Sequence, residues 1–357
     1  MEGLSFPEPD SVSEVMFTTG TTGASKGVQL TQRSMAARAI SNAREYDVRS
    51  NDVSITMVPL NHIAPIMFLD QRMICGSTII FLDSMMKLKL MFDDMDKYGV
   101  TCIFLPPTGI ALLQRLSQNR LADYADRLDF FSTGSAAMTK PQQEYLKRML
   151  PRSRLYCCYA SSECGIVSVY RYDGEDRDVT CYGKPCAAVE LRLVDEAFRP
   201  VPAGSVGLIA VRSEMNMLGY YKRPGLTDAV FRDGYFVTSD LGRLDEEGYL
   251  HVLGRSDDMI NIGGLKVLPS EIENAALRIP GVEECICFAV PDPITGQAAT
   301  LLIKTNAAFS GSVALVKEAL SRTMDYYKVP KRVEIVTEIA KTANGKPDRK
   351  HYQTIFA

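Results

Sequence analysis

Short apolar segments of strand length alternate with segments of helical period between residues 31 and 158, and this alternation restricts the possible folds more than any other feature of the sequence. Runs rich in β-branched and aromatic residues predict strands at 53–60, 79–82, 101–105, 128–132 and 155–158. Periodicity and capping residues predict helices at 31–46, 85–98, 110–116 and 141–150. Such alternation indicates a parallel sheet covered by helices, whose ligands bind at the carboxyl ends of the strands.

Residues 16–29 contain the densest collection of phosphate-binding groups in the chain. Gly20, Gly23 and Gly27 permit backbone angles that bring N–H groups close to an anion. Hydroxyl donors and one mobile cation accompany them, at Thr18, Thr19, Thr21, Thr22, Ser25 and Lys26. The segment is not a Walker loop, because a glycine follows Lys26 where that pattern has Ser or Thr. We expect a polyphosphate-binding loop, with a solvated turn as the alternative.

Composition and charge argue against several classes of function. The 357 residues are 46% hydrophobic with a formal net charge of −3, so the chain can bury a large core and divide into at least two domains. The sequence has no long basic run of the kind that binds nucleic acid. It also has no apolar run long enough to span a membrane and no signal-peptide pattern, so we expect a cytoplasmic protein. Nine cysteines without a Cys-x-x-Cys pair indicate reduced thiols, and three separated histidines argue against a zinc cluster. Any metal should therefore be a hard one.

The pattern changes after Val189 to short strands separated by tight turns, which predicts a small β subdomain. Asp240 is expected at the end of one of these strands, and residues 254–258 form a polar hinge candidate. The sequence thus predicts an α/β fold with two domains. A large domain of helix-covered sheets would span 1–256, with the β subdomain at about 185–256, and a small α+β C-terminal domain on a hinge would span 257–357.

Five segments resemble, in the same order, those of the adenylate-forming superfamily, which contains acyl-CoA synthetases, adenylation domains of peptide synthetases and beetle luciferase. They are the loop at 19–27, the Tyr-Gly-x-Thr-Glu-like element at 159–163, the Thr-Gly-Asp-like element at 238–240, the hinge region at 254–273 and the lysine loop at 344–346. The resemblance extends from about Glu14 to the end of the chain. Each segment alone would be weak evidence, but five in the right order are specific.

The resemblance implies a site for ATP and Mg²⁺. Glu163 and the Thr21 hydroxyl would bind the metal, and Asp240 would bind the ribose with Arg255 assisting. The residues implied to contact ATP are Thr19, Gly20, Thr21, Thr22, Gly23 and Lys26 at the phosphates, Gly134, Ser135 and Ala136 at the adenine, Tyr159, Ala160, Ser161 and Ser162, and Asp240 and Arg255 at the ribose. Taken without the resemblance, Glu163 is also compatible with a solvated carboxylate and Asp240 with an Asp turn.

The resemblance also assigns catalytic roles to Lys346 and Glu163 and implies two half-reactions. Lys346 would stabilise the charge that develops as a carboxylate attacks the α-phosphate. A rotation about Asp257 would then bring Gly263 and Gly264 to the site, so that the thiol of coenzyme A attacks the acyl adenylate.

The acid and the thiol are implied less specifically. His62 and the apolar residues 63–68 would line the acyl pocket of a fatty or aryl acid, although a lone histidine is also often structural. Residues 266–273 are more similar to the acyl-CoA synthetase form than to the peptide-synthetase form, which favours coenzyme A over a carrier protein. Several family residues are replaced, namely by Ser25, Ala160, Ser162, Ser239 and Ala340.

Family members carry a long segment ahead of the phosphate loop, whereas here few residues precede it. We therefore expect exposed apolar surface that a second copy or a partner chain covers. The predicted function is an ATP-dependent acyl-CoA synthetase. The alternatives are an acyl-AMP ligase that loads a carrier protein, and a non-catalytic nucleotide or acyl-adenylate binding protein.

Overall fold

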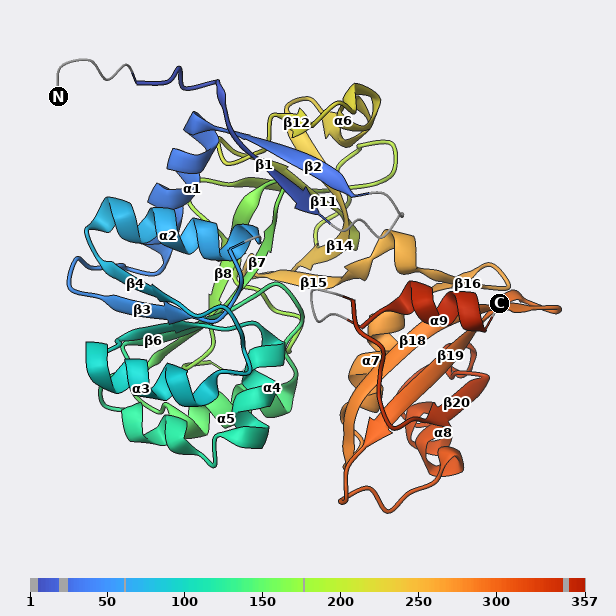
Figure 1. Cartoon of the computed structure of the whole chain (residues 1–357). Coiled ribbons are helices and arrows are strands. Elements are labelled where there is room, and N and C mark those ends of the chain that lie inside the picture. Colours follow the sequence, from blue (N-terminus) through green and yellow to red (C-terminus); the bar gives the residue numbers. More distant parts are fainter. Residues whose placement is uncertain (1–5, 19–24, 61, 176, 343–346, 357) are drawn as a thin grey trace. The chain divides into compact units, whose positions relative to one another are not determined.

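The computed structural model describes residues 6–18, 25–60, 62–175, 177–342 and 347–356 (Figure 1). The chain forms two compact units. The N-terminal unit contains Met1–Thr238 and Arg243–Val252, and the C-terminal unit contains Ser239–Gly242 and Leu253–Ala357. The predicted domain boundary at residues 256 and 257 stays a prediction.

A seven-stranded sheet in the order β4-β3-β5-β6-β7-β8-β9 forms the centre of the N-terminal unit. Its strands are β3 (Val53–Thr56), β4 (Thr78–Phe81), β5 (Cys102–Phe104), β6 (Phe130–Thr133), β7 (Arg154–Ser161), β8 (Gly165–Arg171) and β9 (Lys184–Pro185). The pairs from β4 to β7 are parallel, as the alternation predicts, whereas β8 and β9 are antiparallel to their neighbours. The sequence did not predict the β7–β8 hairpin.

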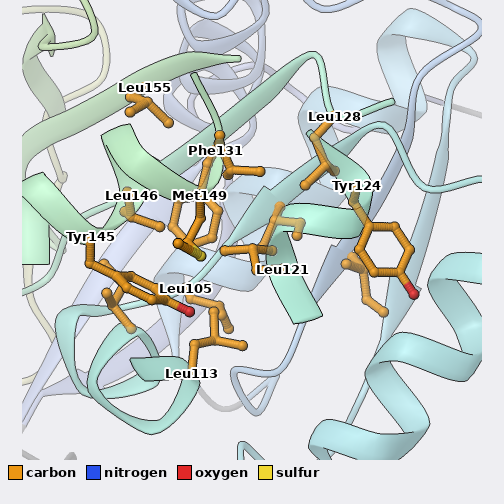
Figure 2. Close-up of a cluster of buried hydrophobic side chains, with 14 of the residues drawn as sticks. Leu105, Leu113, Leu121, Tyr124, Leu128, Phe131, Tyr145, Leu146, Met149 and Leu155 are labelled. Atoms are coloured by element: carbon orange, nitrogen blue, oxygen red, sulfur yellow. The ribbon is translucent and has the colours of Figure 1, made fainter. Parts of the chain in front are cut away.

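Helices cover both faces of this sheet, with α1 and α2 on one face and α3, α4 and α5 on the other (Figure 1). They are α1 (Gln32–Glu45), α2 (Ile63–Cys75), α3 (Leu88–Tyr98), α4 (Pro107–Leu116) and α5 (Lys140–Met149), and the 3₁₀ helix η1 is Arg120–Tyr124. Side chains alternate between the faces along each strand. Phe130 packs on the α2 side with Phe68, whereas Phe131 packs on the side of α3–α5, in the buried cluster that Figure 2 shows. Each large side chain buried in this cluster contributes about 1.5–3 kcal/mol to stability.

Local sequence explains where two of these helices begin and end. Thr31 caps the N-terminus of α1 as predicted, because the Thr31 hydroxyl accepts from the Ser34 backbone N–H at 3.1 Å and Ser34 Oγ accepts from the Thr31 N–H at 3.0 Å. α2 was not predicted as a helix, since its residues were interpreted as pocket lining. It ends at Cys75 and is capped by Gly76, whose φ of 67° is left-handed. The strand predicted at 53–60 ends earlier, at Thr56.

Two smaller sheets contain the hairpin at residues 12–31 and most strands of the predicted β subdomain. One sheet has the order β1-β2-β12 and another the order β10-β11-β14-β13, with β15 paired to β14. Their strands are β1 (Val12–Thr18), β2 (Lys26–Thr31), β12 (Gly219–Tyr220), β10 (Glu190–Val194), β11 (Gly207–Arg212), β13 (Phe231–Arg232), β14 (Tyr235–Leu244) and β15 (Leu250–Arg255), and α6 spans Pro224–Val230.

The C-terminal unit is built on a sheet in the order β17-β16-β19-β18, with β20 parallel to β19. Its elements are η2 (Ser256–Asp258), β16 (Ile260–Ile262), β17 (Leu265–Val267), α7 (Pro269–Ala276), β18 (Val282–Asp292), β19 (Gly296–Thr305), α8 (Val313–Ser321), η3 (Tyr326–Lys328), β20 (Arg332–Ile335) and α9 (Arg349–Ile355). Cys287 of β18 packs with α7 and α8 residues, whereas the next residue, Phe288, stacks on Tyr352 of α9. An α/β N-terminal unit and an α+β C-terminal unit in one chain confirm the predicted fold class. No helix among the described residues is long and apolar enough to cross a membrane.

Candidate functional site

The antiparallel hairpin of β1 and β2 flanks the predicted phosphate loop. The hairpin pairs residues up to Thr18 and Lys26, and Ser25 Oγ donates to the Thr18 carbonyl at 2.9 Å. The predicted phosphate contacts Thr19, Gly20, Thr21, Thr22 and Gly23 lie outside the described residues. Lys26 was expected within the loop, but its pairing with Thr18 makes it the first residue of β2.

Glu163 lies in the turn that joins β7 to β8. Ser161 Oγ accepts from the backbone N–H groups of Glu163 and Cys164, each at 3.2 Å, so this hydroxyl holds the turn. Glu163 Oε1 accepts from the Tyr220 hydroxyl at 3.0 Å. The Lys26 ammonium lies 5.1 Å from the centroid of the Tyr220 ring. Tyr220 therefore contacts both the predicted phosphate-binding cation and the predicted metal-binding carboxylate, residues 137 positions apart in the sequence.

Arg38 holds the same turn by hydrogen bonds, although sequence reasoning did not single it out. Its Nη2 donates to the Ser162 carbonyl at 3.0 Å and its Nε donates to the Met215 carbonyl at 2.9 Å. The side chain is fully buried, and burial lowers the pKa of Arg38 to about 10, against attraction from Cys164, Glu14 and Glu163. Arg38 thus remains a cation at neutral pH and carries positive charge under the Glu163 turn.

The predicted adenine segment directly follows β6. Gly134 is buried, whereas Ser135 and Ala136 are exposed. Ser135 has a φ of 72°, so the backbone turns sharply after Gly134. A Cβ atom at Gly134 would lie 2.7 Å from Cys158 Sγ on the neighbouring strand β7, and this close approach explains why glycine is present.

The β7 residues of the candidate site lie beside a bulge. The register between β7 and β8 shifts between Tyr159 and Ala160, which turns the end of β7 out of the regular ladder. Tyr159 is 8% exposed and makes an edge contact with Tyr182 at 6.3 Å between ring centroids. His62 is half-buried at the N-cap of α2, and Ile63 beside it packs against the cluster that contains Tyr159. The predicted acyl-pocket region and the nucleotide element are thus neighbours in this unit.

The predicted ribose residues lie together in the C-terminal unit. Arg255 Nη1 is 3.9 Å from Asp240 Oδ1, and Arg255 Nη2 is 2.9 Å from Asp257 Oδ2. Arg255 Nη2 also donates to the hydroxyl of Ser239. The expectation that Asp240 ends a strand is wrong, because β14 continues to Leu244 and the chain turns only after it. The predicted hinge residue Asp257 lies in η2 as a partner of Arg255.

Gly263 and Gly264 form the two-residue turn between β16 and β17. Their φ angles are 59° and 92°, as in a type I′ hairpin turn, so both positions favour glycine. The turn is held by hydrogen bonds from the Gly263 N–H to the Thr295 carbonyl and from the Gly264 N–H to Asn261 Oδ1, each at 2.9 Å. The predicted thiol-binding loop is therefore a tight exposed hairpin.

Lys346, the predicted catalytic lysine, lies outside the described residues. The chain on either side of it is held by a bridge between Lys341 and Pro347. Arg349 then makes two hydrogen bonds of 2.9 Å to Glu273 of α7. Glu273 is half-buried, and desolvation raises its pKa against the attraction of Arg349. Sequence reasoning missed this ion pair, since Arg349 and Glu273 come from distant segments.

The chain matches family models of AMP-binding enzymes and is similar in sequence to acyl–CoA ligases. The model of AMP-binding enzymes matches residues 3–221, and that of their C-terminal domain matches residues 271–346. A sulfoacetate–CoA ligase from Cupriavidus necator is 28% identical over 96% of this chain and 67% of its own length. A medium/long-chain-fatty-acid–CoA ligase from Mycobacterium tuberculosis is 29% identical over 98% of this chain and 62% of its own length.

Solved structures agree with these matches. ATP-bound MatB from Rhodopseudomonas palustris superposes with a TM-score of 0.88 at 28% identity, over 98% of this chain and 70% of that one. The O-succinylbenzoate coenzyme A synthetase of Bacillus subtilis with AMP, at 24% identity, has a TM-score of 0.84 over 96% of this chain and 69% of that one, and shows the fold alone. The chain spans about two thirds of the length of such relatives. With a family model that covers more than half of its residues, the chain belongs to the family of AMP-binding enzymes.

Proposed function

We propose that this chain is an ATP-dependent acid–thiol ligase that activates a carboxylic acid as an acyl adenylate and transfers the acyl group to coenzyme A. The observation that carries the proposal is the junction of Lys26 and Glu163 through Tyr220 at the base of the predicted phosphate loop. A cation and a carboxylate that contact the same tyrosine suit a metal–polyphosphate ligand, since the cation pairs with phosphate and the carboxylate binds the metal.

The donor chemistry around Glu163 fits Mg²⁺. This ion prefers oxygen ligands and usually binds through one or two carboxylates together with substrate phosphates and water. Among the described residues, no cluster of three or more His, Cys, Asp or Glu side chains could hold a metal. Glu163, with Thr21 from the loop, would instead hold Mg²⁺ that arrives with ATP. Bound Mg²⁺ would neutralise phosphate charge and ease departure of pyrophosphate.

The proposed chemistry has two steps. In the first, a carboxylate oxygen of the acid attacks the α-phosphorus of ATP, and the bond to pyrophosphate breaks. Lys346 would offset the negative charge that builds on the transferring phosphoryl oxygens. In the second, the thiol sulfur attacks the acyl carbon, AMP leaves and the thiol proton passes to solvent. A turn about Asp257 would exchange Lys346 for the Gly263–Gly264 hairpin between the steps.

The proposed acid is fatty or aryl. Ile63 and Ile66 of α2 pack against the cluster of Tyr159, so apolar side chains adjoin the β7 element. Relatives that are 30–31% identical include a long-chain-fatty-acid–CoA ligase of Escherichia coli and a feruloyl-CoA synthase of Amycolatopsis. The same chemistry with a carrier-protein thiol in place of coenzyme A is the nearest alternative.

Association with a second copy or a partner chain also belongs to the proposal. Exposed apolar side chains lie on α1 and α2, where Ile40 is 55%, Met73 69% and Ile74 54% exposed. Light scattering coupled to gel filtration measures the mass of the particle in solution. A particle mass near twice the chain mass of 39.5 kDa would support association between copies, and the monomer mass at all concentrations would contradict it.

The function is tested by pyrophosphate release from ATP with a panel of fatty, aryl and amino acids, with and without coenzyme A or a pantetheinylated carrier protein. We expect acid-dependent release that becomes steady turnover with coenzyme A. Lys346→Ala should slow adenylate formation by roughly 10²–10³-fold while ATP still binds. Lys350→Ala, a nearby exposed lysine on α9, is the control. ATP binding without release for any acid would favour a non-catalytic binding protein.

A further inference from the structure

Tyr220 occupies a rigid position beside the phosphate hairpin. It belongs to β12, which pairs with β2 so that Tyr220 lies opposite Val28. The Tyr220 N–H donates to Thr227 Oγ1 at 2.9 Å, and Gly219 before it has a φ of 159° and leaves no room for a side chain against Thr227. The Tyr220 side chain is only 5% exposed. Backbone pairing and burial therefore fix where its ring and hydroxyl lie.

The two ends of the Tyr220 side chain meet opposite charges. Its hydroxyl donates to Glu163 Oε1 at 3.0 Å, a hydrogen bond strengthened by the charge of the carboxylate. Its ring lies 5.1 Å from the Lys26 ammonium, within the range of a cation–π contact. The bond to Oε1 restricts rotation of the carboxylate, so that its second oxygen, Oε2, has a defined orientation. The contact with the ring likewise restricts the flexible side chain of Lys26.

We propose that Tyr220 is a positioning residue for metal-bound ATP, which orients the Glu163 carboxylate through its hydroxyl and the Lys26 ammonium through its ring. This inference rests on the proposed function and adds a residue to its site. Groups that orient a metal ligand typically contribute 10–100-fold to metal affinity. Removal of the hydroxyl alone should therefore weaken metal binding to the nucleotide complex, while the contact with Lys26 persists.

The test uses the full chain, ATP without acid, and Mn²⁺ as a paramagnetic substitute for Mg²⁺. Free Mn²⁺ is measured by electron paramagnetic resonance, and ATP binding without metal is measured by calorimetry. The variants are Tyr220→Phe, Tyr220→Leu, Glu163→Gln and Glu163→Gln with Tyr220→Phe. Tyr221→Phe is the matched control, because Tyr221 is the next residue and is 42% exposed. Circular dichroism establishes that each variant is folded.

We expect Tyr220→Phe to weaken Mn²⁺ binding in the ATP complex about 10-fold or more and to leave metal-free ATP binding unchanged. Tyr220→Leu should also weaken metal-free ATP binding, because it removes the contact with Lys26. In the Glu163→Gln background, Tyr220→Phe should have little further effect, since both changes act on one interaction.

A Tyr220→Phe chain that binds Mn²⁺ as tightly as the wild type would overturn the positioning role, provided that Glu163→Gln weakens binding. Equal losses from Tyr220→Phe in both backgrounds would also overturn it, because a purely structural effect would not depend on Glu163. If Glu163→Gln has no effect, or the wild-type chain binds no Mn²⁺ with ATP, the proposed function fails and the positioning role fails with it.

Discussion

Gly134→Ala is the substitution whose effect the structure defines most sharply. Gly134 has no positive φ, so alanine can adopt its backbone conformation without strain. The added methyl group, however, would lie 2.7 Å from Cys158 Sγ, whereas ordinary van der Waals contact begins at 3.4 Å. Cys158 is 7% exposed and packed among aromatic side chains, so its sulfur has little space to move. Either β7 or the Gly134 backbone must shift.

The cost of such overpacking is about 1–3 kcal/mol. A shift of the Gly134 backbone would also displace Ser135 and Ala136, the segment proposed to lie beside adenine. Gly134→Ala should therefore lower the free energy of unfolding by about 1–3 kcal/mol and weaken AMP binding. Combination with Cys158→Ala removes the clashing sulfur and should restore much of both quantities, which a double-mutant cycle measures.

Urea unfolding followed by tyrosine fluorescence gives the stability, and calorimetry gives AMP affinity. Gly174→Ala is the control, because a Cβ atom there meets no atom within 4 Å. The steric reasoning is refuted if Gly134→Ala is as stable as Gly174→Ala, or if Cys158→Ala fails to suppress its effect. Reduced stability with unchanged AMP binding would remove this segment from the nucleotide site.

Three further predictions concern charge and backbone conformation. Burial and the nearby Asp70 raise the pKa of Glu14 in the folded chain, so ionisation of Glu14 opposes folding above its unfolded pKa. Glu14→Gln should therefore raise the melting temperature by roughly 1–3 °C at pH 8 but not at pH 4, and a decrease at pH 8 would contradict this. The Lys331 ammonium holds the pKa of Asp292 well below its usual range, so the stabilisation of the folded chain by this ion pair is present above about pH 4 and is lost as the pH falls further. Asp292→Asn should make thermal stability less sensitive to acid below about pH 4. An unchanged acid profile would exclude the ion pair as a cause of this sensitivity. Gly264→Ala should cost about 1–2 kcal/mol in urea unfolding, because its φ is 92°, and a neutral result would contradict the strained turn.

The sequence predicts most local structure of this chain, because local structure depends on local pattern. The alternation of strands and helices identifies the parallel part of the large sheet, and the Thr31 cap identifies the start of α1. The strand containing Asp240 was predicted too short, since its polar residues resemble a turn although Leu241 and Leu244 continue the strand. α2 was missed because a mostly apolar helix has little periodic contrast.

The candidate site is less predictable, because its key contacts join distant segments. Tyr220 reaches Lys26 and Glu163 only through the pairing of β12, a strand of two residues, with β2. So short a strand has no period that sequence reasoning can detect. Arg38 similarly donates to the carbonyl groups of Ser162 and Met215, which lie more than 120 residues away in the chain. Long-range packing decides these roles.

Exchange of labelled pyrophosphate into ATP tests the central claim most directly, because it requires reversible formation of an acyl adenylate and no thiol. The account predicts exchange that depends on Mg²⁺ and on a fatty or aryl acid, and that is strongly reduced in Glu163→Gln and Lys346→Ala. If the purified chain binds ATP but supports no exchange with any acid of the panel, the proposed ligase activity is contradicted.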